Sequence, residues 1–132
     1  MAKKKPDPKR KLITLSEGEK TYSMSRAVVQ GDWCFVSGTV GYDYSNGELP
    51  ESAAQQAMNT FANIQAALKA GGFELGHTIR VQYTLSDRAH INTVLPVINQ
   101  HFANILPAAT MVIADLVDDR MKVEIEVTAF KG

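Results

Sequence analysis

The sequence has little of what marks membrane, secreted or cofactor-binding proteins. No apolar run approaches the roughly 18 residues that a membrane helix needs, and the basic N-terminus is not followed by the apolar stretch of a secretory signal. The single cysteine, Cys34, excludes an intrachain disulfide, and its place between Trp33 and Phe35 favours an inert buried thiol. The three histidines lack metal-ligand spacing, and no dinucleotide, phosphate-loop or serine-nucleophile motif occurs. We therefore expect a cytoplasmic protein without metal, cofactor or membrane span.

The charges cancel overall but are unevenly distributed along the chain. Residues 1–11 (MAKKKPDPKRK) hold six of the 14 basic residues and one of the 14 acidic residues, so the remainder is mildly acidic. With two prolines and no apolar periodicity, this segment is predicted to be a disordered basic tail ahead of a single domain over 12–132. The tail could contact nucleic acid, although short charge runs are more often simply solvated.

The clearest helix is predicted over Glu51–Gly71. Ser52 with Gln55 three residues later can cap its start, and Gly71-Gly72 can end it in a left-handed turn. Polar residues on the side of the helix opposite its apolar stripe are expected to face water: Gln56, Asn59, Asn63 and Lys69. The apolar stripe that is expected to face a sheet consists of Ala54, Ala57, Met58, Phe61, Ile64 and Leu68.

A second helix is predicted over Asn92–Phe102. If Asn92 is the N-cap, Pro96 falls in the first turn, where its missing N–H does little harm. The residues expected to point inward are Val94, Leu95, Ile98 and Phe102.

The remaining patterned segments indicate strands. Alternation puts Ile79, Val81, Tyr83 and Leu85 on one face of a strand over 78–85. Together the segments predict an α+β fold with one mixed six-stranded sheet and both helices on one face. Glu124 and Glu126 then lie on the other face, which must meet water or another subunit. The remaining predicted strands are 12–15, 24–30 paired with 33–37 about the turn Gly31-Asp32, 110–116 and 121–130.

Five segments in this order resemble the YjgF/RidA family from about Leu12 to the end of the chain. They are VSGTVG (36–41), QQAMNTFANIQAALKAGG (55–72), VQYTLSDRAHINTV (81–94), LPAATMV (106–112) and VEIEVTAF (123–130). The resemblance implies a chorismate-mutase-like fold and a homotrimer with a central β-barrel and ligand clefts between subunits. It also implies hydrolysis of reactive imines or enamines to carbonyl compounds and ammonia.

The sequence departs from the family pattern at two positions. In the RidA branch, the arginine two residues after the proline of the Pro-Ala motif binds the substrate carboxylate, and here that position is Ala109. The branch's tyrosine corresponds to Met24, whereas the glutamate of the last strand is kept as Glu124 and the Ser-Gly pair as Ser37-Gly38. The resemblance therefore does not name the substrate, and these two departures imply that it is not a standard 2-imino acid.

Candidate site residues follow from the resemblance and the strand pattern. Glu124 is the candidate general acid–base; the alternative is a solvated or salt-bridged strand residue. Arg26 shares a strand face with Met24 and could supply a replacement cation, or form an interface salt bridge. The other substrate-binding candidates, which alternatively cap strands or pack on the surface or in the core, are Ser37, Gly38, Thr39, Tyr42, Phe102, Thr110 and Met111.

Three functions remain open from the sequence. The first is imine or enamine hydrolysis without a cofactor, and the second is binding of a small metabolite in the intersubunit clefts without turnover. The third is nucleic-acid binding or RNA cleavage, which only the basic tail supports, because the acidic body argues against a phosphate groove.

Overall fold

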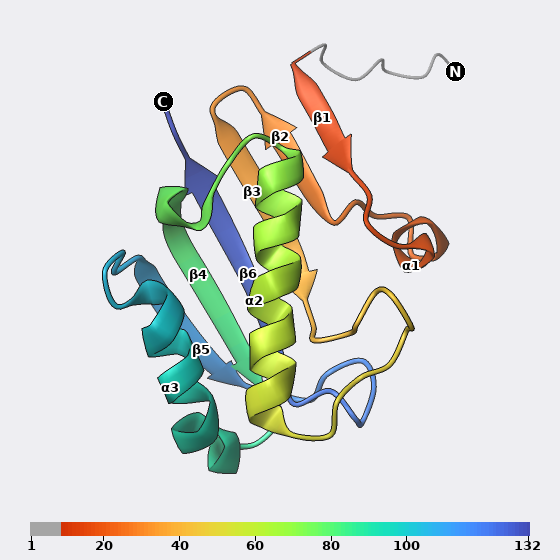
Figure 1. Cartoon of the computed structure of the whole chain (residues 1–132), viewed down its shortest axis with the longest axis vertical. Helices are drawn as coiled ribbons and strands as arrows, with labels where there is room; N and C mark the ends of the chain where they lie inside the picture. Colours follow the sequence, from red (N-terminus) through yellow and green to blue (C-terminus); the bar gives the residue numbers. More distant parts are fainter. Residues whose placement is uncertain (1–8) are drawn as a thin grey trace.

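The computed structural model describes residues 9–132. The strands in this range form one six-stranded sheet in the order β1-β2-β3-β6-β4-β5 (Figure 1). Neighbouring strands are antiparallel except β4 and β5, which are parallel and are joined through α3. This mixed sheet confirms the predicted α+β fold. The elements are β1 (Arg10–Ile13), α1 (Glu17–Thr21), β2 (Ala27–Gln30), β3 (Trp33–Thr39), α2 (Ala53–Ala70), η1 (Leu75–His77), β4 (Thr78–Leu85), η2 (Arg88–His90), α3 (Ile91–Phe102), β5 (Ala108–Ile113) and β6 (Val123–Phe130).

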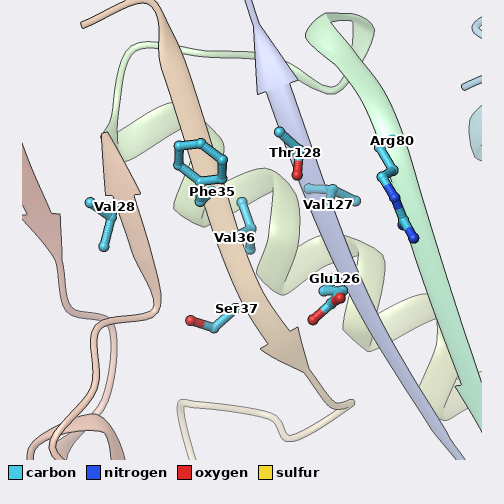
Figure 2. A pocket seen from close by; sticks show the side chains of 8 residues that line it. All are labelled: Val28, Phe35, Val36, Ser37, Arg80, Glu126, Val127 and Thr128. Carbon is cyan, nitrogen blue, oxygen red and sulfur yellow. The ribbon is translucent and has the colours of Figure 1, made fainter. Parts of the chain in front are cut away.

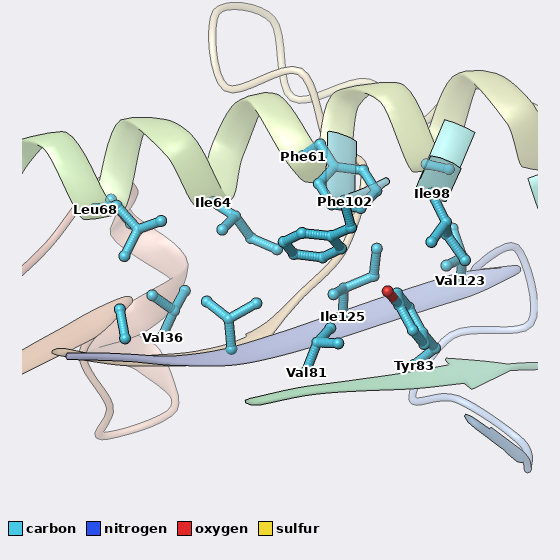
Figure 3. Close-up of a cluster of buried hydrophobic side chains, with 14 of the residues drawn as sticks. Val36, Phe61, Ile64, Leu68, Val81, Tyr83, Ile98, Phe102, Val123 and Ile125 are labelled. Atoms are coloured by element: carbon cyan, nitrogen blue, oxygen red, sulfur yellow. The ribbon is translucent and has the colours of Figure 1, made fainter. Parts of the chain in front are cut away.

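Both long helices, α2 and α3, cover the same face of the sheet (Figure 1), as predicted. Strand β6 runs through the middle, and its alternate residues point to the helices and to the open face. Phe102 of α3 packs edge-on against Phe61 of α2, with 5.3 Å between ring centroids. The side chains that fill the space between helices and sheet in Figure 3 include Val36, Ile64, Leu68, Val81, Tyr83, Ile98, Val123 and Ile125.

The first strand begins earlier than predicted. β1 includes Arg10 and Lys11, which were assigned to the disordered tail, and it ends at Ile13. Both cationic side chains have partners: Arg10 Nε donates to Gln30 Oε1 at 2.9 Å, and Lys11 Nζ donates to the Ala70 carbonyl at 2.9 Å. The last carbonyls of a helix attract a cation, which explains how a charged segment is held on this edge. The rest of the predicted tail, residues 1–8, lies outside the described residues.

The inward alternation predicted for β4 is wrong at its start. The pairing of β4 with β6 shifts between Thr78 and Arg80, which reverses the faces there. Thr78 is consequently buried, whereas Ile79 is 43% exposed. A single-sequence pattern cannot show such a shift, because the alternation Ile-Arg-Val-Gln fits a regular strand equally well.

The second helix also differs from the prediction. α3 begins at Ile91 and follows the 3-10 turn η2, in which the Asp87 side chain accepts from the Ala89 N–H. Pro96 therefore lies beyond the first turn, and Val97 is buried whereas Leu95 is exposed. Asp87, which caps the turn that leads into α3, is not identified by the sequence analysis, and the predicted start at Asn92 lies one residue too late.

The first predicted helix is confirmed with its caps. The Ser52 hydroxyl accepts from the Gln55 N–H at 2.9 Å. At the other end, Gly72 adopts φ of 84°, and the Phe73 N–H bonds to the Leu68 carbonyl at 2.8 Å. This arrangement is a Schellman ending, in which glycine tolerates the left-handed backbone.

The prediction that Gln56 faces water is wrong, because Gln56 is fully buried. Its Nε2 donates to the carbonyls of Pro50 at 2.7 Å and Arg120 at 2.9 Å, and its Oε1 accepts from the Lys122 N–H at 2.8 Å. One amide thus satisfies backbone groups of the two loops that precede α2 and β6. Counting polar residues on a helix cannot reveal this, since the partners are far away in sequence.

Asn59 and Asn63, one and two turns further along α2, continue this stripe. Asn59 Nδ2 donates to the Gly41 carbonyl at 3.1 Å. Asn63 Nδ2 donates to the carbonyls of Val40 at 3.1 Å and Tyr42 at 2.8 Å. Asn63 is buried, again contrary to the prediction. The amide stripe, defined as Gln56, Asn59 and Asn63, therefore fixes the loops that follow β3 and precede β6.

Replacing Gln56 with alanine is expected to lower the free energy of unfolding by about 3 kcal/mol, because three backbone groups lose the hydrogen bonds to this buried side chain. The matched control is Gln65→Ala at an exposed position of the same helix, expected to cost about 0.5 kcal/mol or less. Urea denaturation followed by circular dichroism measures both. Equal losses in the two variants would contradict the structural role of the amide stripe.

Candidate active site

A pocket of about 390 Å³ opens where the end of β3 and the start of β6 meet α1. The loops on either side of the amide stripe supply its outer wall. Because β3 and β6 are antiparallel, Gly38 and Glu124 lie at the same end of the sheet. The lining residues are Ser16, Gly18, Glu19, Tyr22, Met24, Arg26, Gly38, Val40, Tyr42, Tyr44, Val117, Met121 and Glu124.

The Glu124 carboxyl group lies against the backbone of Gly38. A Cβ atom at position 38 would lie 2.6 Å from Glu124 Oε1, which is too close for any side chain. The pairing of β3 with β6 is irregular between Val36 and Thr39, so the strand backbone is displaced where the carboxyl group approaches. Only glycine at position 38 is compatible with this placement of Glu124.

Burial raises the pKa of Glu124, and the nearby charge of Glu126 raises it further, whereas Arg26 acts in the opposite direction. The net pKa lies above the usual value for a carboxyl group. A carboxyl group with a raised pKa is better matched to proton transfer near neutral pH than an ordinary glutamate.

Arg26 also contacts the backbone at Gly38. Its Nη1 donates to the Gly38 carbonyl at 2.7 Å and to Thr39 Oγ1 at 3.2 Å. Thr39 Oγ1 in turn donates to the Ser37 carbonyl at 2.7 Å. The buried Nε of Arg26 has no hydrogen-bond partner among the described residues. The guanidinium therefore holds the displaced strand and places a positive charge near Glu124.

A second carboxylate faces Arg26 from α1. Glu19 is almost fully buried, and Glu19 Oε1 accepts from the N–H groups of Leu15 at 2.7 Å and Ser16 at 3.0 Å. Burial raises the pKa of Glu19, but hydrogen bonds from Ser16 and Leu15 and the charge of Arg26 outweigh it, so the pKa falls below its usual value. Glu19 thus stays ionised at neutral pH and offsets the charge of Arg26.

Comparison with known proteins identifies the family. The sequence pattern of the endoribonuclease L-PSP family matches residues 16–131. The chain belongs to this family. It is 29% identical to the 2-iminobutanoate/2-iminopropanoate deaminase of Rattus norvegicus over 125 residues, which is 93% of this chain and 91% of the relative. A RutC family protein of Sinorhizobium fredii is 31% identical, over 77% of this chain and 82% of its own length.

Solved structures of the L-PSP family share the fold. A member of the YjgF/YER057c/UK114 family from Mycobacterium tuberculosis superimposes with a TM-score of 0.84 and 29% identity, over 92% of this chain and 99% of its own. RidA from an Antarctic Psychrobacter gives a TM-score of 0.80 and 26% identity, over 90% and 94% of the two chains. The predicted YjgF/RidA membership and chorismate-mutase-like fold are confirmed.

Four residues predicted for the site of this L-PSP family member lie together in the pocket: Glu124, Arg26, Gly38 and Tyr42. Thr39 is buried behind them as a partner of Arg26. Ser37 lies elsewhere, in a depression of about 330 Å³ on the open face of the sheet, where Figure 2 shows it near Glu126. Its hydroxyl donates to the Ser25 carbonyl at 2.8 Å.

The remaining predicted residues are not near Glu124 within one protomer. The prediction that Phe102 binds substrate is wrong, because it is 4% exposed and packs in the core under α2. Its place on the apolar stripe of α3 explains this burial. Thr110 and Met111 belong to β5 at the exposed edge of the sheet, and β4 separates that strand from β6.

Sequence reasoning missed α1 and with it Glu19 and Tyr22 as lining residues. A signal for α1 was present, since Ser16 followed three residues later by Glu19 is the spacing of a capping box. The structure shows that box formed.

Other titratable groups lie outside the pocket. Cys34 is buried, as predicted, and this burial raises the pKa of its thiol to about 11. Among the residues that the structure describes, no group of three or more His, Cys, Asp or Glu side chains is placed to hold a metal ion. Within 9–132, no helix has the length and apolar character needed to cross a membrane.

Two substitutions should move the pKa of Glu124 in opposite directions. Glu126→Gln removes a negative charge that raises this pKa, so the pKa should fall. Arg26→Gln removes the positive charge that lowers it, so the pKa should rise. Titration of the Glu124 side-chain carboxyl by ¹³C NMR measures both shifts. Shifts of the same sign, or none, would show that the charges around Glu124 are arranged differently.

Proposed function

We propose that this protein hydrolyses a reactive imine or enamine to a carbonyl compound and ammonia, without a cofactor, and that Glu124 is its general acid–base. The observation that carries the proposal is a half-buried carboxyl group with a raised pKa in a pocket. The similarity over 93% of the chain to a protein named as a 2-iminobutanoate/2-iminopropanoate deaminase supports this reaction class.

The chemistry requires one group that first accepts and then donates a proton. Glu124 accepts a proton from water as the water oxygen attacks the imine carbon, and returns it to the imine nitrogen, which gives a carbinolamine. Glu124 then accepts the hydroxyl proton of the carbinolamine and donates it to the amine nitrogen, the C–N bond breaks, and ammonia leaves as the carbonyl forms. The overall change is R₂C=NH + H₂O → R₂C=O + NH₃. A carboxyl group with a raised pKa is a stronger base than an ordinary glutamate and can return the proton that it accepts.

The proposed assembly is a homotrimer with a central β-barrel and with the pockets at clefts between subunits. One protomer leaves apolar side chains exposed on the open face, including Trp33, Phe35 and Phe130. It also leaves all of β5 exposed, with Met111 and Val112 each 37% exposed. Exposed apolar surface of this kind is typical of protein interfaces. In such a trimer, Ser37, Thr110 and Met111 are proposed to approach the pocket of a neighbouring subunit.

We also place this chain in a branch without the arginine that binds the substrate carboxylate. The position two residues after Pro107 is Ala109, on exposed β5. A methyl group cannot donate the paired hydrogen bonds of a guanidinium. A standard 2-imino acid is therefore not the proposed substrate.

The second candidate function is binding of a small metabolite without turnover. Ala109 and Met24 favour it, since both depart from the residues that the catalytic branch uses. Nucleic acid fits the described pocket poorly, because Arg26 is the one cation among its lining residues and stands beside Glu19 and Glu124.

Replacing Glu124 with glutamine should abolish most of the catalysis, by about 100-fold or more, because the amide cannot transfer the proton. Imines are generated in situ with amino-acid and amine oxidases, and imine decay and ammonia release are followed. The control is Glu51→Gln, which removes the same charge from an exposed position outside this pocket. Equal rates for wild type and Glu124→Gln would refute the role of Glu124. No acceleration by wild type would favour the binding function.

Gly38→Ala is expected to reduce turnover by about tenfold or more without unfolding the protein, because the new methyl group displaces the Glu124 carboxyl. Gly76→Ala is the control, since a Cβ atom there meets its nearest neighbour, Glu74 Oε1, at 3.4 Å. Steady-state kinetics and circular dichroism are measured on both. Full activity in Gly38→Ala would mean that the close packing of Glu124 on this glycine is dispensable.

A further inference from the structure

We infer that the pocket selects a protonated imine that carries an apolar or aromatic substituent and no carboxylate. This inference rests on the proposed hydrolysis and names the substrate class for the same site. Its basis is the charge and the composition of the pocket lining, which favour a cation over an anion.

The charge balance of the pocket is the first argument. The lining residues include two carboxylates, Glu19 and Glu124, and one guanidinium, Arg26. Nη1 of Arg26 is already engaged by the Gly38 carbonyl and Thr39 Oγ1, and its charge faces Glu19 and Glu124. With Glu126 adding a further negative charge near Glu124, the local field disfavours a second anion. A cation in the pocket would instead relieve the repulsion between the carboxylates.

The charges of Arg120 and Asp118 do not alter the charge balance of the pocket. Arg120 interacts with Tyr42, but its Nε and Nη2 donate to Asp118 at 3.0 Å and 2.9 Å. This pair is exposed and contributes no net charge. Apart from Arg26, whose Nη1 is engaged and whose unpaired Nε is buried, the described lining residues supply no guanidinium that could act as a carboxylate clamp.

The aromatic and apolar side chains of the pocket lining are the second argument for an apolar cation. Three of the four tyrosines in the chain line this pocket, namely Tyr22, Tyr42 and Tyr44. The faces of aromatic rings attract cations, and tyrosines grouped with carboxylates are a common arrangement for binding them. The rest of the wall suits an apolar substituent, since it consists largely of Met24, Val40, Val117 and Met121.

The chemistry of the reaction agrees with a cationic substrate. Protonation makes the imine carbon more electrophilic, and Glu124 as a carboxylate can then accept the proton of the attacking water. The balanced reaction is R–CH=NH₂⁺ + H₂O → R–CHO + NH₄⁺. The reaction that supplies such a substrate is the two-electron oxidation of a primary amine R–CH₂–NH₂ by an amine-oxidising enzyme. Oxidation of an amino acid would give a carboxylate-bearing imine instead.

Three ligands of nearly equal size and shape test the inference directly. Benzamidinium is a stable planar cation that mimics a protonated aryl imine, benzamide is neutral, and benzoate is an anion. Isothermal titration calorimetry on the full chain is expected to show benzamidinium binding at least about tenfold more tightly than benzoate, with benzamide between them. Glu124→Gln should weaken benzamidinium about tenfold. The control Glu51→Gln, at an exposed position outside the pocket lining, should retain binding.

The opposite order would overturn the inference. If benzoate binds more tightly than benzamidinium and Arg26→Gln abolishes that binding, Arg26 is an anion clamp. Absence of binding by all three ligands would also refute the proposed selectivity.

Turnover separates this inference from the proposed function. The imine from oxidation of benzylamine should be hydrolysed with a higher kcat/KM than the 2-imino acid from oxidation of phenylalanine. A protein that binds benzamidinium selectively but hydrolyses neither imine would refute the enzymatic proposal and leave the cation selectivity standing. Faster hydrolysis of the 2-imino acid would refute the substrate class and leave the enzymatic proposal standing.

Discussion

A carboxyl group packed against bare backbone is the constraint on which the rest of the site depends. Glu124 approaches Gly38 so closely that no Cβ atom fits between them, and Arg26 holds the Gly38 carbonyl from the other side. Burial and Glu126 raise the pKa of Glu124, so its ionisation opposes folding. The neutral carboxyl therefore favours the folded state below the ordinary carboxyl pKa, and this contribution is lost as the pH rises through the folded-state pKa. The fold tolerates this loss of stability at the position of the proposed acid–base group.

The amide stripe of α2 links this local arrangement to the whole fold. Gln56 binds backbone groups of the loops that precede α2 and β6, and Asn63 binds the carbonyls of Val40 and Tyr42. The loops that carry the outer wall of the pocket thus depend on a helix whose apolar side forms the core. Packing of α2 on β6 therefore helps to position both Glu124 and Tyr42.

The sequence was sufficient for features that repeat locally and insufficient for those that depend on distant partners. Helix α2, the hairpin at Gly31 and the alternation of β6 follow from periodicity and turn chemistry. The resemblance supplied Glu124 and Gly38, which the structure brings together. The burial of Gln56, the exposure of Ile79 and the start of α3 were predicted wrongly, because each depends on a remote hydrogen bond, a register shift or an unrecognised cap. Phe102 was misplaced for a simpler reason, since an apolar helical residue usually belongs to the core.

The most direct test of Glu124 as the acid–base group is the pH dependence of kcat/KM for imine hydrolysis, compared with the ¹³C NMR titration of the Glu124 carboxyl in the same protein. If Glu124 acts as proposed, the midpoint of the acidic limb of the rate profile coincides with the NMR midpoint, and both move together in Glu126→Gln. A rate profile whose midpoint differs from the titration of Glu124, or stays fixed when that titration moves, would contradict the role assigned to this residue.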